Sequence, residues 1–290
     1  MFAAWKFNET WMDHTVRDLL TYSTCVMFAC GFLIQILNML LLSYALQSVL
    51  CVLFFSTLTL LLLIIYLGFR YDHSIITCIV SYLFSTFTLL ITWRISVLLQ
   101  MHWVSPFFCT AVLLKVFSYC LFAWSDLRKL KAEGSTRAHP HNTRFEWQLF
   151  FLRIVIGFVF VPHFTEKLFA GPLIRADDIV AFQTLGFSPA VWYVYLAGLI
   201  ELAISFSIGC GFLTRLGAII GAIYLLTATY FGHHFNIGFI WASKGGGWEY
   251  PVIWTTCILS FACFGADRFS FDQMLKTRYH CPRWIQYLMG

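Results

Sequence analysis

The chain alternates long apolar stretches with short polar connections. The first charge-free stretch, Leu19–Phe69, is far too long for one membrane crossing and should fold back as two helices near Ser43–Gln47. A crossing of about 30 Å of hydrocarbon takes roughly 20 helical residues. Six further apolar stretches come close to that length: about Ser74 to Leu99, Val104 to Trp124, Gln148 to Pro162, Pro189 to Phe212, Leu216 to Phe231, and Pro251 to Phe264.

This pattern predicts an all-α, polytopic membrane protein with about eight transmembrane helices. Backbone groups in lipid must be satisfied within the segment, which helices achieve. The composition agrees, because 60% of the residues are hydrophobic and 11% are charged. Soluble domains contain about 25% charged residues. A soluble globule is thereby excluded, and the lipid bilayer is the first partner the sequence implies.

The basic residues are unevenly divided between the two sides of the predicted helices. One side receives Lys167, Arg175 and Lys244, and the other receives Lys6, Arg17, Arg70, Arg128, Lys129, Lys131, Arg137, Arg144, Arg215, Arg268, Lys276, Arg278 and Arg283. Cytoplasmic loops carry the Lys and Arg excess. We therefore expect a multi-pass protein of the cell inner membrane with both termini cytoplasmic. Topology accounts for the net charge of +5, so no nucleic-acid partner is predicted.

A polar segment, Ser125 to Trp147, divides the apolar stretches into two groups of four. The predicted organisation is an N-terminal membrane unit of four helices over residues 1–125, a cytoplasmic linker over 126–146, a four-helix membrane domain over 147–280, and a C-terminal tail over 281–290. The linker histidines, His139 and His141, are too few to form a metal site by themselves.

The second group carries a series of short motifs in a fixed order. They are Arg153-Ile-Val-Ile-Gly157, His163-Phe-Thr-Glu166-Lys167-Leu, Leu-Gly186-Phe-Ser-Pro189, Gly198-Leu-Ile-Glu201-Leu, Gly211-Phe-Leu-Thr214-Arg215, Gly247-Trp248-Glu249-Tyr250-Pro251, and Gly265-Ala-Asp-Arg268-Phe-Ser270-Phe-Asp272. Over about residues 145–275 the chain resembles the DoxX-like family of bacterial membrane proteins. The first 125 residues lie outside that resemblance.

The resemblance implies a four-helix membrane bundle and an association with membrane redox chemistry. Members of the family have been linked to membrane oxidoreductases, including a subunit of an archaeal thiosulfate:quinone oxidoreductase, and to oxidative-stress and metal-associated complexes. The expected partners are therefore other membrane or periplasmic redox proteins. Most members have no assigned reaction, so the resemblance implies a fold more directly than an activity.

Polar residues gather where three predicted helices reach the outer face. The candidate ligand-binding residues there are His163, Glu166, Lys167, Tyr230, His233, His234, Trp248 and Glu249, and Trp103 or Trp248 is a candidate wall. His163, His233, His234 and Glu249 are candidate metal ligands, since imidazole and carboxylate suit transition metals such as Zn, Cu, Fe or Ni. The same groups can bind a quinone head group and manage its protons. Alternatively, they are interface residues hydrogen-bonded to loops and water.

Glu201 falls in the middle of a predicted helix, too far from either end for its carboxylate to reach water. Such a residue must be protonated, paired or placed in a cavity, and it is functional by default. Arg153 and Lys167 are candidate cationic partners, and Tyr193, Tyr195 or Ser205 are candidate hydrogen-bond partners. Glu201 is also the candidate catalytic residue and a further candidate ligand-binding residue.

The sequence therefore predicts an integral membrane subunit or partner of a redox system that holds a quinone or a metal ion at the outer face. Two other functions remain open. One is a non-enzymatic assembly or chaperone subunit that docks through its Phe-rich first half. The other is a small-solute transporter in which Glu201 and Lys115 line a path. The sequence contains no complete catalytic constellation, such as a nucleophile with its base, and no flavin fingerprint.

Overall fold

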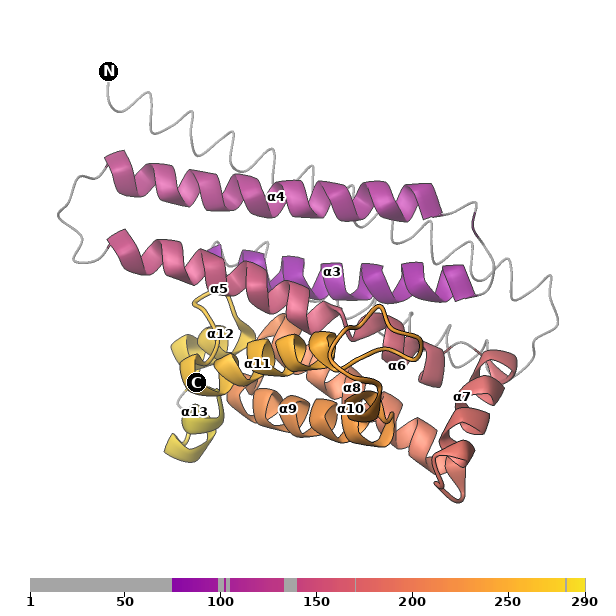
Figure 1. Ribbon diagram of the computed structural model, residues 1–290. Helices are drawn as coiled ribbons and strands as arrows, with labels where there is room; N and C mark the ends of the chain where they lie inside the picture. The colour runs from indigo at the N-terminus through magenta and orange to yellow at the C-terminus, as the bar shows by residue number, and fades with distance from the viewer. Residues whose placement is uncertain are drawn as a thin grey trace. The chain divides into compact units, whose positions relative to one another are not determined.

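The computed structural model describes residues 75–98, 102, 105–132, 140–169, 171–279 and 281–289, and these are almost entirely helical and form no strands. The helices are α3 (Ile75–Leu98), α4 (Ser105–Ala132), α5 (Pro140–Phe158), α6 (Val161–Leu168), α7 (Pro172–Thr184), α8 (Ala190–Cys210), α9 (Thr214–Phe231), α10 (His234–Ile237), α11 (Glu249–Phe264), α12 (Phe271–Arg278) and α13 (Arg283–Met289) (Figure 1). The predicted all-α class is confirmed for this part of the chain.

Within the described residues, four helical segments are long and apolar enough to cross a membrane. They are Phe108–Arg128, Thr143–Leu168, Ala190–Cys210 and Thr214–Phe231. Glu249–Phe264 is a shorter apolar helix. The prediction of eight spans is therefore not confirmed, and the two helices expected within 19–69 lie outside the described residues. The 24-residue α3 matches the stretch predicted from Ser74 to Leu99.

The chain divides into two compact units. One includes Thr88–Ala138, and the other includes Tyr66–Phe87 with His139–Gly290. In the first, Leu89 of α3 packs against Phe108 and Ala111 of α4. The boundaries predicted for the domains remain predictions. The second unit contains the predicted site residues from His163 to Glu249.

Helices α5, α6, α8, α9 and α11 enclose the core of the second unit (Figure 1). Helices α5, α6 and α9 pack against α8, and α11 packs against α9. The fully or almost fully buried members of the core are Phe160, Ile204, Ile208, Ala218, Leu225, Trp254, Ile258 and Phe261. Phe87 of α3 adds its ring to this unit, stacked on Phe158 with centroids 5.6 Å apart.

Small residues allow the helices of this unit to approach closely. A Cβ on Gly157 of α5 would lie 2.3 Å from the backbone nitrogen of Gly209 on α8. A Cβ on Gly217 of α9 would lie 1.9 Å from the Ser207 hydroxyl. Ser205 adds an interhelical bond by donating its hydroxyl to the Gly157 carbonyl at 2.8 Å. Membrane helices commonly associate through such small residues, because backbones can then meet directly.

The segment predicted to end at Pro162 instead turns and continues as a second helix. Val159 and Phe160 form the turn between α5 and α6, and Pro162 occupies the first turn of α6. Proline suits a helix start because its missing N–H is one that no helical carbonyl would accept. The candidate span consequently runs to Leu168. His163, Glu166 and Lys167 therefore lie on a helix of their own.

Candidate functional site

A buried polar group joins three helices of the second unit. The Lys167 ammonium of α6 lies 3.0 Å from Oε2 of Glu201 on α8 and donates a hydrogen bond to its Oε1 at 3.1 Å. Tyr224 of α9 donates its phenol hydroxyl to the same Oε1 at 2.5 Å. Lys167 is 9% and Glu201 4% exposed. We call Lys167, Glu201 and Tyr224 the buried polar group.

The local sequence explains why Lys167 reaches Glu201. A Cβ added to Gly198 would lie 2.9 Å from the Leu168 side chain and 3.0 Å from Lys167 Cβ, so only glycine lets the end of α6 settle on α8. Gly198 and Glu201 are three residues apart and share one face of α8. The Lys167 ammonium is held further by a hydrogen bond of 3.2 Å to the His163 carbonyl.

Arg175 fixes the same end of α6 from the helix that follows it. It is 6% exposed, and its Nε donates to the Lys167 carbonyl at 2.7 Å while Nη2 donates to the Leu168 carbonyl at 3.1 Å. Nη1 donates to the Tyr195 hydroxyl at 2.7 Å. The last carbonyls of a helix have no intrahelical partners, and a cation is favoured near them. Arg175 thereby links α6, α7 and α8 beside the buried polar group.

A second carboxyl, Asp178, lies near this group on α7. It interacts electrostatically with Lys167, Glu201 and Tyr224. Burial raises the pKa of Asp178, Glu166 and Asp177 add to the increase, and the positive charges of Lys167 and Arg175 oppose it. Neither Arg175 nor Asp178 was predicted as a site residue, because the stretch between the apolar segments ending at Pro162 and beginning at Pro189 is too short and polar for a membrane crossing. The charged residues within that stretch were the available signal.

In the structure, Glu201 has one cationic partner and one hydrogen-bonding phenol. Lys167 is the cation, whereas Arg153 is occupied elsewhere. The hydrogen-bonding phenol is Tyr224, and none of Tyr193, Tyr195 and Ser205 is its donor. Glu201 Oε2 lies 3.0 Å from the Lys167 ammonium and accepts no further hydrogen bond within the described residues. It retains capacity to accept a proton or a donor from a ligand.

The predicted outer-face histidines have different surroundings from one another. His163 is exposed, and its ring centroid lies 5.7 Å from that of Trp254. His233 is exposed, with a positive φ of 57°. His234 is partly buried, and its Nδ1 lies 2.7 Å from the Gly246 carbonyl. Tyr230 is 67% exposed and contacts the Phe231 ring.

The Gly-rich segment before α11 forms a closed turn. Trp248 N–H donates to the Gly238 carbonyl at 3.0 Å, and Gly247 N–H donates to the Ile240 carbonyl at 3.2 Å. Glu249 accepts a hydrogen bond from the Trp241 N–H at 3.2 Å. Trp248 is partly buried and packs edge-on against Phe239, with centroids 4.7 Å apart. The glycines serve this turn.

Four ring contacts in series separate His163 from His234. The rings follow one another from His163 to Trp254, Tyr250, Trp241 and His234, with centroids 5.7, 5.4, 5.4 and 5.6 Å apart. Among the residues that the structure describes, no three His, Cys, Asp or Glu side chains are grouped so that they could hold a metal ion. The metal assignment of His163, His233, His234 and Glu249 therefore rests on the sequence alone.

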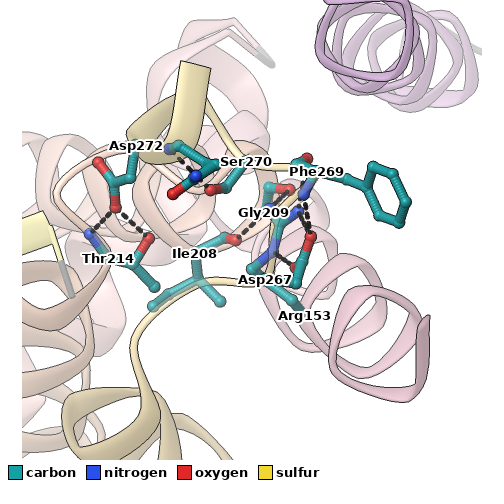
Figure 2. Close-up of polar contacts among 9 residues, drawn as sticks. Arg153, Ile208, Gly209, Thr214, Asp267, Phe269, Ser270 and Asp272 are labelled. Carbon is teal, nitrogen blue, oxygen red and sulfur yellow. Dashed lines mark hydrogen bonds and ion pairs between the residues drawn. The ribbon is translucent and has the colours of Figure 1, made fainter. Parts of the chain in front are cut away.

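The opposite ends of these helices are tied by a second buried network (Figure 2). Arg153 Nε lies 2.7 Å from Asp267 Oδ2, and both side chains are completely buried. The guanidinium also donates to the carbonyls of Gly209 at 2.7 Å and Phe269 at 3.2 Å. Arg153 thus joins α5 to the end of α8 and to the segment before α12.

Asp272 extends this network to the start of α9 (Figure 2). Its carboxylate accepts from the Leu213 N–H at 2.7 Å, the Thr214 N–H at 2.9 Å and the Thr214 hydroxyl at 2.7 Å. It therefore satisfies N–H groups that have no helical partner. Burial raises the pKa of Asp272, although these hydrogen bonds oppose the increase. Both networks fix helix ends.

The long apolar helices of the described residues define a helical membrane protein with several candidate membrane-spanning helices. Residues 148–234 match the model of the DoxX family, which confirms the predicted resemblance for this part of the chain. The match includes the whole buried polar group and Asp178 but ends before Trp248 and the Asp267 and Asp272 networks. The first 147 residues lie outside it. No curated protein and no solved structure matches the chain.

Proposed function

We propose that the protein is an integral membrane partner of a redox system, and that its buried polar group binds a quinone head group and exchanges protons with it. One observation carries the proposal: three proton-exchanging side chains from three helices meet at a buried point inside membrane-spanning segments. Intramembrane ionisable residues usually mark substrate pathways or proton relays.

The donor set fits a quinone. The Lys167 ammonium has donors that suit a carbonyl oxygen, and Glu201 is an acceptor and a proton source when protonated. Tyr224 donates its single hydroxyl proton to Glu201 and so orients that carboxyl. A quinone accepts two electrons and two protons to become a quinol. The electrons come from the partner redox protein, while Glu201 holds and passes protons at the carbonyl and Tyr224 supports it by its hydrogen bond. The apolar residues around the group exclude water and strengthen these interactions.

The competing explanation is that the ion pair only holds α6 on α8. A buried pair is by itself weak evidence for stability, because its desolvation cost offsets the attraction. The free acceptor capacity of Glu201 Oε2 also favours a ligand. We further propose that the group faces the periplasmic side of the inner membrane and that both termini are cytoplasmic, as the basic residues indicate.

Quinone binding is tested by titrating the full chain in lipid nanodiscs with decylubiquinone. In a second experiment, bound quinones are extracted from the protein purified from its host membranes. Tyr224→Phe removes one donor and should weaken binding about five- to tenfold, the effect of a hydrogen bond worth ~1 to 1.4 kcal/mol. Tyr230→Phe is the matched control, since Tyr230 lies on the same helix but is 67% exposed. Equal quinone content in loaded and empty nanodiscs would contradict the proposal.

A further inference from the structure

Helix α7 presents one face to the buried polar group. Arg175 on this face is buried and bonded to the last carbonyls of α6. Asp178 follows Arg175 by three residues and therefore lies on the same face. Asp177, its neighbour in sequence, is exposed. The two adjacent acids consequently have different surroundings.

Asp178 lies at the boundary between the surface and the interior of the unit. Its side chain is partly exposed, but Oδ2 is buried and has no hydrogen-bond partner within the described residues. Leaving a buried acceptor without a partner is unfavourable, so such an atom calls for an explanation. Arg175, on the same face, is bonded to the Lys167 carbonyl, which places this face of α7 beside the buried polar group. Asp178 also interacts electrostatically with Lys167, Glu201 and Tyr224.

We propose that Asp178 is the proton-exchange residue that connects the buried polar group to the aqueous phase on the side of α7. This inference rests on the quinone function proposed above and deepens it. It makes α7, and Asp178 in particular, the route by which protons consumed at Glu201 are replaced.

The transfer conserves protons and charge. When Glu201 gives a proton to the quinone, it becomes a carboxylate beside the Lys167 ammonium. Lys167 then passes a proton to Glu201 and becomes a neutral amine, and protonated Asp178 restores the ammonium. The Asp178 carboxylate finally takes a proton from water. The lysine is suited to this step because its ammonium already contacts Glu201 at 3.0 Å.

The charges around Asp178 favour this role. Arg175 and Asp177 share its helix, Glu166 and Lys167 act from α6, and Glu201 acts from α8. Burial and the two neighbouring acids of the α6 and α7 segments favour its protonated form, while the two cations favour its carboxylate. Opposed influences of this kind bring a carboxyl towards the range in which it can both take and give a proton.

Voltammetry of the nanodisc-embedded chain loaded with decylubiquinone tests the inference, because the electrode supplies the electrons and the scan-rate dependence gives the rate of proton-coupled reduction. Empty nanodiscs provide the background. Asp178→Asn should leave quinone affinity within twofold of the wild type but slow reduction at least tenfold at neutral pH. Formate, a small weak acid, should restore the rate. Asp177→Asn, the matched control, should behave as the wild type.

The outcomes separate the two proposals. Wild-type nanodiscs that bind no quinone above background would overturn the quinone function and this inference with it. If the wild type binds quinone but Asp178→Asn is reduced at the wild-type rate, the inference alone is wrong. It is equally wrong if the variant is slow and formate restores nothing, because a purely structural role would give that result.

Discussion

Arg153 Nε lies 2.7 Å from Asp267 Oδ2, and neither side chain has any exposed surface. Removing one partner of such a pair leaves a buried charge uncompensated, which costs about 3 to 5 kcal/mol. We expect Arg153→Ala to lower the free energy of unfolding by about that amount, measured by denaturant titration in detergent micelles.

The matched control is Arg268→Ala. Arg268 lies 3.1 Å from Glu146, but their side chains are 33% and 24% exposed. Exposed ion pairs contribute roughly 0 to 1 kcal/mol. Equal losses of stability in the two variants would show that the Arg153 network is not a main support of the helix ends.

The approach of α5 to α8 gives a second prediction. An alanine Cβ at Gly157 would lie 2.3 Å from the Gly209 backbone nitrogen, and a backbone cannot give way as a side chain can. Gly157→Ala should therefore cost about 1 to 3 kcal/mol, the usual range for overpacking. Gly221→Ala should cost less, because its Cβ would meet the Ile204 side chain at 3.1 Å. The reverse order of melting temperatures would contradict this packing.

The sequence predicted most of the described helices because long apolar runs have few structural alternatives in lipid. It also predicted that Glu201 is buried and paired, since the middle of an apolar helix offers a carboxylate no water. Tyr224 could not be chosen as its hydrogen-bond donor, because the rotation of α9 against α8 depends on packing at residues such as Gly217 and Gly221.

Helix α7 was missed for a different reason. Its 13 residues are too few and too polar to read as a membrane crossing, and the segment was taken for a loop. Asp178 was lost with it, although it interacts with all three members of the buried polar group. Pro162 was read as a helix end, whereas it begins α6. Neither α6 nor α7 could be predicted from the length of an apolar run, because both helices are short.

Membrane orientation is tested by cysteine labelling in intact cells. We expect an impermeant maleimide to react with Lys244→Cys, from the turn before α11, and to spare Ser135→Cys, from the polar segment before α5. The distribution of basic residues is the physical reason. The parent chain, which keeps its ten cysteines, gives the background. Labelling of Ser135→Cys alone would place the buried polar group nearer the cytoplasmic side.

The half-buried position of Asp178 predicts that Asp178→Asn stabilises the protein in a pH-dependent way. Burial raises its folded-state pKa above the ordinary value of 3.8, so the folded state binds this proton more tightly than the unfolded chain. Stability is then lost as pH rises from the unfolded to the folded pKa. Asp178→Asn should raise the melting temperature at about pH 8 and give little change near pH 4. Asp177→Asn serves as the control, and a gain independent of pH would contradict the argument.

The Lys167–Glu201 pair allows stability and function to be separated. Lys167→Met leaves the buried Glu201 carboxylate without its cation and should cost about 3 to 5 kcal/mol. Adding Glu201→Gln removes that charge while the amide oxygen can still accept from Tyr224, so the double variant should recover most of the loss. Decylubiquinone binding and its proton-coupled reduction should stay impaired in the double variant, since neither the ammonium nor the carboxyl is present. If the double variant fully recovers both decylubiquinone binding and its reduction, the pair only holds α6 on α8. The assembly-subunit alternative would then be favoured.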